Sequence, residues 1–207
     1  MKRKLGTIFM LCGAALILSA LSLFGYNQWE EQQANQSVVE LLPQLIEEIP
    51  DTTSTPDIPH QPMGIPVEYL DPSAFEMTEV EIGSYAYIGY LSIPTLELEL
   101  PIMSSWSYPQ LKIAPCRYYG SVRGKDLVLL AHNYWKHFGR IKELSEGDSV
   151  FFTDMDGETY EYTVAAKDIL EPTAVEEVTA GEYDLALFTC TPGGTSRVTI
   201  YCNLKIN

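Results

Sequence analysis

A strand-turn-strand signature near the C-terminus constrains the fold of this 207-residue chain more than any other stretch. Two β-rich apolar runs, Leu185–Cys190 and Arg197–Leu204, flank the breaker Pro192-Gly193-Gly194. Strand-forming residues on both sides of such a break predict a β-hairpin. The hairpin sets the Cys190 thiol where the first strand ends and the Arg197 guanidinium where the second begins. A nucleophile beside a fixed cation suits attack on a carbonyl and stabilisation of the oxyanion.

The N-terminus has the pattern of a membrane anchor. Three basic residues, Lys2 to Lys4, precede an uncharged run whose apolar part, Leu5 to Gly25, has about the ~20 residues that a membrane helix needs. Basic residues before the run and Trp29 after it place the N-terminus in the cytoplasm and the remainder outside. We therefore expect a cytoplasmic tip at 1–4 and a transmembrane helix at 5–26. A cleaved signal peptide is the alternative, but no clean small-x-small cleavage site follows the run.

Residues 27–80 differ in composition from the rest of the chain. They contain eleven Asp or Glu, no Lys or Arg, and seven of the thirteen prolines. Val38 to Ile49 has helical apolar spacing interrupted at Pro43, whereas Asp51 to Pro72 is Pro-rich and predicted to be an extended linker. The segment is interpreted as an acidic stalk that holds a domain away from the membrane.

Residues 81–207 are long enough for one small domain, and their pattern is almost all β. Short β-rich runs separated by Gly, Pro, Asp and Ser predict a barrel or a sandwich. Two segments, Tyr108–Ile113 and Phe138–Leu144, have the pattern of short helical turns. The predicted strands are Tyr85–Ile93, Leu96–Leu100, Asp126–His132, Ser149–Thr153, Thr159–Leu170, Leu185–Cys190 and Arg197–Leu204.

The charge of the domain excludes one large class of partner. Residues 81–207 carry seventeen acids against ten bases, so nucleic acid is a poor candidate. The acidic run Asp154-Met155-Asp156-Gly157-Glu158 between two predicted strands is interpreted as a hairpin turn, with weak Ca²⁺ binding as the alternative. No cysteine or histidine spacing typical of a zinc site occurs.

The cysteines indicate a free thiol. Cys12 lies in the predicted membrane span, and the three cysteines of an exported domain cannot all pair. Cys202 follows Val198 and Ile200 at a period of two, which predicts that it points into the core. Cys190 is therefore the candidate free thiol, although a buried apolar role is the alternative for any single cysteine.

A histidine at the end of an apolar strand is the candidate acid or base. Asp126–His132 delivers His132 to a strand end, where it is followed by the polar and aromatic residues Asn133, Tyr134 and Trp135. His137 lies in the next loop and is predicted to be a surface or cleft-rim residue. Tyr134, Trp135 and Trp106 are predicted either to form the rim of a groove or to pack in the core.

Four segments together resemble the sortases, the cysteine transpeptidases that attach proteins to Gram-positive cell walls or build pili. Ile93–Ile102 resembles the opening hairpin of that family, and Ala131-His132-Asn133 resembles its Gly-His-Asn or Gly-His-Arg. Leu187-Phe188-Thr189-Cys190 matches its Leu-x-Thr-Cys, and Arg197 follows at the next strand. The resemblance covers about Tyr87 to Lys205, and the N-terminal anchor and stalk are similar to the membrane topology of the family.

This resemblance implies an all-β fold, a closed barrel of about eight strands with short helices, and a groove for a Leu-Pro-x-Thr-Gly sorting signal. Cys190 would attack the Thr carbonyl, His132 would protonate the leaving amine and Arg197 would hold the substrate backbone or the oxyanion. Asn133, Thr189 and Thr191 are the implied substrate-binding residues. The acceptor would be an amine of a cell-wall precursor or a pilin, at the outer face of the membrane, with no cofactor or metal.

Two departures from the family pattern leave the subclass open. Ala131 replaces the usual glycine before the histidine, and the turn from Cys190 to Arg197 is short. Two alternatives to a transpeptidase also stay open at this point. One is an exported cysteine peptidase or hydrolase that uses the same Cys/His pair, and the other is an anchored binding module in which Cys190 is structural.

Overall fold

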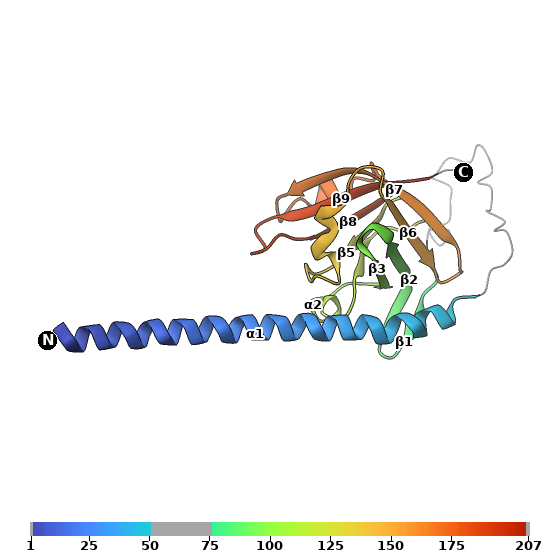
Figure 1. Ribbon diagram of the computed structural model, residues 1–207. Helices are drawn as coiled ribbons and strands as arrows, with labels where there is room; N and C mark the ends of the chain where they lie inside the picture. The colour runs from blue at the N-terminus through green and yellow to red at the C-terminus, as the bar shows by residue number, and fades with distance from the viewer. Residues whose placement is uncertain (1, 51–75, 206–207) are drawn as a thin grey trace, which may run out of the picture.

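A computed structural model describes residues 2–50 and 76–205. It contains one long N-terminal helix, α1 (Lys2–Glu48), and a nine-stranded sheet with short helical turns (Figure 1). The strands are β1 (Val80–Ile82), β2 (Tyr85–Ile93), β3 (Leu98–Met103), β4 (Cys116–Tyr119), β5 (Leu127–Leu130), β6 (Ser149–Asp154), β7 (Thr159–Leu170), β8 (Leu185–Cys190) and β9 (Arg197–Leu204).

Eight of the strands close into a barrel. Their order is β2-β3-β4-β5-β8-β9-β7-β6, and β6 pairs again with β2, while β1 adds to β2 as an extra strand. Closure pairs the backbone groups that an open sheet would leave at its edges. The predicted all-β barrel of about eight strands is therefore confirmed.

The alternation of side chains along β9 explains how the barrel wall separates two apolar layers. Val198, Ile200 and Cys202 belong to the central core inside the barrel, whereas Tyr201 belongs to a second cluster on the outer face. Successive residues of a strand point to opposite faces, so this period of two follows directly from the sequence. The prediction that Cys202 faces the core is confirmed, since the residue is fully buried there.

The helix α1 is continuous far beyond the predicted membrane span. Its first part projects clear of the barrel, with large apolar side chains exposed, and it is the one helix among the described residues that is long and apolar enough to cross a membrane (Figure 1). Its second part packs against the barrel, where Ala34 and Leu45 are fully buried. Leu45 shares the outer cluster with Met103 of β3.

This packing changes the interpretation of the predicted stalk. The stalk begins as a helix docked on the domain, and it continues through Pro43, whose missing N–H costs a helix interior about 3 kcal/mol. Burial of Leu45 just beyond Pro43 offsets that cost, because a fully buried Leu contributes about 1.5–3 kcal/mol. The predicted linker Asp51–Pro72 lies outside the described residues.

Two predicted strands have other bounds in the structure: Leu96–Leu100 is present as β3 (Leu98–Met103), and Asp126–His132 as β5 (Leu127–Leu130), which ends two residues before His132. The other differences are short elements. The two predicted helical turns are present as α2 (Tyr108–Leu111) and η4 (Phe138–Glu143). The sequence analysis missed β1, β4, η3 (Pro94–Leu96) and α3 (Val175–Val178), each only three or four residues long. Their signals are too short for a periodicity to be detected.

Candidate active site

The predicted catalytic residues lie on, or just after, the ends of three adjacent strands. Cys190 of β8 is paired directly with Arg197 of β9. In the parallel pair β5–β8, Leu130 lies opposite Phe188, and the Ala131 N–H donates to the Phe188 carbonyl at 3.3 Å. Because side chains alternate along a strand, Cys190 takes the face of Phe188, and Arg197 takes the same outer face of the barrel wall. His132 lies two residues after the end of β5, the strand that pairs with β8.

Thr189 links the end of β8 to the residue that follows β5. It is buried, and its hydroxyl donates to the Ala131 carbonyl at 2.8 Å. The bond joins the residue before the thiol to the residue before the histidine, so it holds the two strand ends at a fixed separation. The inward orientation of Thr189 indicates a positioning role, which differs from the substrate contact that the resemblance implied.

The turn after the thiol is held by its own hydrogen bonds. The Thr191 N–H donates to the Ser196 carbonyl at 3.0 Å, and the Thr191 hydroxyl accepts from the Ser196 N–H at 3.1 Å. Gly193 and Gly194 have φ of +87° and +74°, values at which a side chain is strained. Arg197 Nη1 donates to the carbonyls of Gly194 and Ser196 at 3.2 and 3.1 Å, so its guanidinium is folded back on the turn.

The environment of His132 combines burial with a nearby carboxylate. Burial lowers the pKa of His132 below its ordinary value, and Glu30 of α1 raises it in part. The imidazole lies against Tyr134, with 4.9 Å between ring centroids. A helix that begins in the predicted membrane span therefore contributes a charge to the site.

The structure corrects the prediction for His137. It is fully buried, and neither ring nitrogen makes a hydrogen bond to the described residues. Burial lowers the pKa of His137 to about 4, while the nearby backbone of Ala34 raises it slightly. The prediction of a surface residue was wrong because α1, about a hundred residues earlier in the chain, covers this loop.

The other aromatic and amide residues of the loop lie at the surface. Trp135 and Trp106 are exposed, so neither packs in the core. Asn133 is also exposed and lines a hollow of about 560 Å³ between α1 and the loop, together with Trp135, Gln28 and Gln32. The Trp135 N–H donates to Glu31 of α1 at 2.6 Å.

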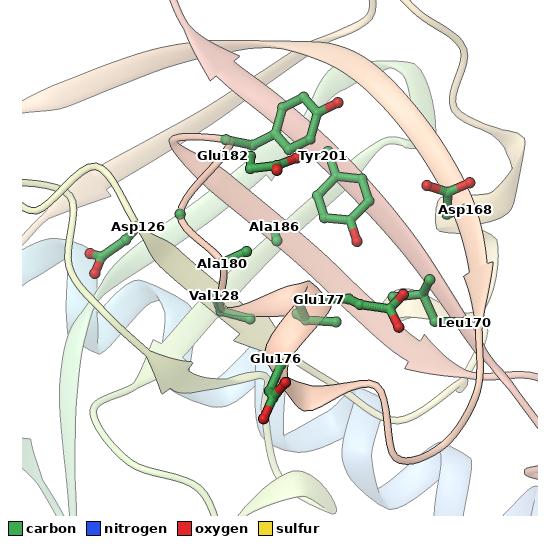
Figure 2. A pocket seen from close by; sticks show the side chains of 13 residues that line it. Asp126, Val128, Asp168, Leu170, Glu176, Glu177, Ala180, Glu182, Ala186 and Tyr201 are labelled. Atoms are coloured by element: carbon green, nitrogen blue, oxygen red, sulfur yellow. The ribbon is translucent and has the colours of Figure 1, made fainter.

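A second hollow, of about 430 Å³, continues the same outer face away from the thiol (Figure 2). Its floor includes Val128, Ala186 and Tyr201, which are paired across β5, β8 and β9. Ala186 lies four residues before Cys190 on β8. The connection from β7 to β8, including α3, walls the hollow, and Tyr183 stacks on Tyr201 with 4.7 Å between centroids. The location of this groove was not predicted from the sequence. Its carboxylates are Asp126, Asp168, Glu176, Glu177 and Glu182.

The predicted turn between β6 and β7 is confirmed as a hairpin turn. Asp154 Oδ1 accepts from the N–H groups of Asp156 and Glu158 at 3.0 and 2.9 Å. Burial raises the pKa of Asp154. In the ranges 2–50 and 76–205, no group of three His, Cys, Asp or Glu side chains is placed to hold a metal ion.

The cysteines divide by burial. Cys116 and Cys202 are buried and unpaired, and burial raises the pKa of each thiol to about 12. Cys190 is also unpaired but partly exposed. Only the thiolate form is a nucleophile, so Cys190 is the domain cysteine whose surroundings allow reaction.

Comparisons with known proteins identify the family of the chain. The family model of the sortase domain matches residues 91–205. Sortase A of Bacillus anthracis is 32% identical over 125 residues, which cover 58% of this chain and 59% of that protein. The chain therefore spans less than two thirds of this relative.

Solved structures show the same fold. Sortase A from Corynebacterium diphtheriae superposes with a TM-score of 0.55 at 23% identity, covering 60% of this chain and 63% of the other. Sortase C1 from Streptococcus suis superposes with a TM-score of 0.51 at 26% identity, covering 58% and 74%. With the family model matching more than half of its length, the chain belongs to the sortase family.

Proposed function

We propose that the protein is a membrane-anchored cysteine transpeptidase. It would cleave a sorting signal of the Leu-Pro-x-Thr-Gly kind and transfer the acyl group to an amine of a cell-wall precursor or a pilin. The observation that supports this proposal is the direct pairing of Cys190 with Arg197 across β8 and β9, with the Cys190 thiol partly exposed and His132 two residues after the neighbouring strand β5.

The first half of the reaction forms an acyl-enzyme. The Cys190 thiolate attacks the carbonyl carbon of the scissile bond, and the resulting oxyanion collapses as the C–N bond breaks. The His132 imidazolium gives its proton to the departing amine, which leaves as a neutral group. A thioester then links the substrate to Cys190, and the imidazole is neutral.

The second half returns the enzyme to its starting state. The acceptor amine attacks the thioester carbonyl and gives a proton to His132, and the C–S bond breaks to restore the thiolate. Burial lowers the pKa of His132, which favours the neutral base needed here, whereas Glu30 supports the charged acid needed in the first half. The opposing effects of burial and Glu30 on the pKa of His132 thus suit it to act first as an acid and then as a base.

Arg197 would stabilise the oxyanion in both halves. Its two hydrogen bonds to the turn use Nη1 and do not involve the other terminal nitrogen, and Arg197 pairs with Cys190 across β8 and β9. A fork of donors fixed near the nucleophile suits an oxyanion that forms only in the transition state. The segment before the scissile bond would lie along the groove over Val128, Ala186 and Tyr201.

The test uses the full chain in lipid nanodiscs with a Leu-Pro-x-Thr-Gly peptide and a short amine, analysed by mass spectrometry. We expect a ligated product and a Cys190 thioester, both absent from Cys190→Ala. Release of the free acid alone, with the amine in excess, would identify a hydrolase. No turnover of any peptide by folded protein would favour the binding module and overturn the proposal.

A further inference from the structure

We propose that the active-site end of the barrel rests on the membrane surface and that its exposed aromatic and basic side chains bind anionic lipid headgroups. This proposal rests on the membrane anchor of the proposed function. It adds a second contact with the bilayer, made by the catalytic domain itself. The contact surface consists of Trp106, Tyr108, Lys112, Trp135 and Lys136.

The continuity of α1 fixes the height of the domain above the membrane. The helix runs without a break from the apolar segment, which ends at Gly25, into its contact with the barrel. Figure 1 shows the apolar part leaving the barrel on the side toward which the β8–β9 turn points. No flexible spacer separates the two parts of α1, so the barrel cannot move independently along the membrane normal.

The contacts along α1 show which end of the barrel lies nearest the lipid. The first contacts after Gly25 are made with the site end: Glu30 pairs with Lys112 at 2.5 Å, and Glu31 accepts from the Trp135 N–H. The later residues Leu41 and Leu45 pack against the cluster that includes β2 and β3. The loop that carries His132 is therefore closer to the membrane than the opposite side of the barrel.

The distance along the helix is short enough for contact. Glu31 lies six residues after Gly25, which corresponds to about 9 Å along an α-helix. The headgroup region on each side of the hydrocarbon core is about 5–7 Å thick. When α1 stands upright, the backbone beside Glu31 therefore lies about 2–4 Å above the headgroup layer, which long Trp and Lys side chains can reach.

Aromatic side chains collect at this level. Trp135 is 58% exposed and Tyr108 is 73% exposed, which is unusual for such large rings in a folded domain. Trp106 is also exposed and contacts Tyr108 edge-on, with 6.0 Å between ring centroids. Trp and Tyr are the residues that favour the headgroup level of a bilayer.

The charge distribution also matches an anionic surface. Residues 100–142 contain seven of the ten bases of the domain and only one of its seventeen acids, Asp126. Lys112 and Lys136 lie beside α1 at the site end, and the Arg140 guanidinium lies over the Trp135 ring at 4.9 Å. Lys112 is paired with Glu30 and Arg140 with Glu143, so Lys136 is the basic residue of this group that forms no ion pair with a carboxylate of the described residues. A basic residue near an anionic leaflet contributes about 1 kcal/mol. An anionic leaflet would repel the acidic remainder of the domain, so only this end of the barrel would contact the lipid.

Depth-dependent fluorescence quenching tests the contact. The chain has three tryptophans, so changing two of them to Phe leaves Trp29, Trp106 or Trp135 as the single probe in the full chain. The matched control replaces all three by Phe and adds Val39→Trp, an exposed position on α1 fourteen residues, or about 21 Å, beyond Gly25. The nanodiscs contain phosphatidylcholine and phosphatidylglycerol with a nitroxide on the headgroup or deep in the acyl chain.

We expect the headgroup nitroxide to quench Trp106 and Trp135 at least about twofold more than the Val39→Trp control, with Trp29 quenched as a reference. The deep nitroxide should quench none of them as strongly. Quenching of Trp106 and Trp135 no greater than that of the control would overturn the proposal. Ligation activity is measured on the same samples, so loss of the lipid contact is distinguished from failure of the proposed transpeptidase.

Discussion

At the scale of single residues, burial separates the candidate nucleophile Cys190 from the two other cysteines of the domain. Cys116 and Cys202 lie in apolar surroundings that keep them as thiols, whereas Cys190 stands at the end of β8 opposite Arg197. We predict that Cys190→Ala abolishes acyl-enzyme formation. Cys116→Ser and Cys202→Ser should keep it. Cys202→Ser should lose about 1–3 kcal/mol of stability because it buries a hydroxyl in the apolar core, and Cys116→Ser should lose less, since the Ala114 carbonyl lies 3.5 Å from Sγ and can accept a hydrogen bond.

The measurement is thioester formation by mass spectrometry beside the melting temperature of each variant. Wild-type protein treated with a thiol-blocking reagent serves as the inactive reference. A Cys116→Ser protein that folds normally but forms no thioester would reassign the nucleophile.

Arg197 offers the clearest distinction between a catalytic and a structural role. Its guanidinium binds the carbonyls of Gly194 and Ser196, so a purely structural role would be to brace the turn. If it stabilises the oxyanion, its loss should lower kcat/KM on the order of 10²–10³-fold. Arg197→Lys keeps the charge but loses the planar fork, so we predict that it stays severely impaired.

The assay is kcat/KM for Arg197→Ala and Arg197→Lys together with their melting temperatures. Ser196→Ala is the matched control, because it leaves the backbone carbonyl that Arg197 contacts. Rates within about threefold of wild type for both Arg197 variants would show that the guanidinium only braces the turn, since an oxyanion donor contributes far more.

At the scale of elements, burial of His137 where α1 covers the loop 131–138 should make the free energy of unfolding fall as the pH is lowered. His137 is buried beneath Ala34, and its pKa falls to about 4, against about 6.5 in an unfolded chain. A lowered pKa means that the unfolded chain binds the proton more readily. The stabilisation is therefore fully present above about pH 6.5 and is lost as the pH falls toward 4.

We predict that the free energy of unfolding falls by about 3 kcal/mol from this residue over that range. His137→Phe fills the buried site without a titrating group, so its stability should decline less steeply. The measurement is chemical denaturation of both proteins between pH 7 and pH 4. Parallel declines in the two proteins would show that His137 does not titrate with unfolding.

Strand length and flanking breakers decide which elements can be predicted from the sequence. The strands β2, β7, β8 and β9 have the predicted bounds, because each has six or more residues of strong β propensity between clear breakers. The strand β4 has only Cys116 to Tyr119 and gives no comparable signal. The docking of α1 was also missed, since Glu30 and Lys112 are 82 residues apart and local pattern carries no information on such a pair.

At the scale of the whole molecule, the sequence indicated which residues fall near strand ends, but it did not indicate their surroundings. The positions of His132, Cys190 and Arg197 at predicted strand ends were enough to predict that these side chains can converge. The groove over Tyr201 depends on how the β7–β8 connection folds back, and the burial of His137 depends on a distant helix. These features arise from tertiary packing, which no short sequence window contains.

The last prediction concerns how much of the chain the catalytic domain needs. From the sequence alone, a chain that starts at Glu81 should be soluble and active. The structure adds that α1 buries Ala34, Val38 and Leu45 against the barrel and supplies Glu30 beside His132. We therefore predict that a chain starting at Asn27 is soluble and stable, whereas one starting at Glu81 loses about 3–6 kcal/mol, from the apolar burial that α1 provides.

The comparison needs three proteins: the full chain and the chains that start at Asn27 and at Glu81. The full chain should fractionate with membranes, since its apolar helix segment is unburied. Recovery of the full chain as a soluble protein cleaved near Ala20 would show that the segment is a signal peptide. Equal denaturation midpoints for the two shorter chains would show that α1 does not stabilise the barrel. A loss of stability confined to the Glu81 chain, together with a slower ligation rate, would show that the barrel needs the docked helix for both its stability and its active site.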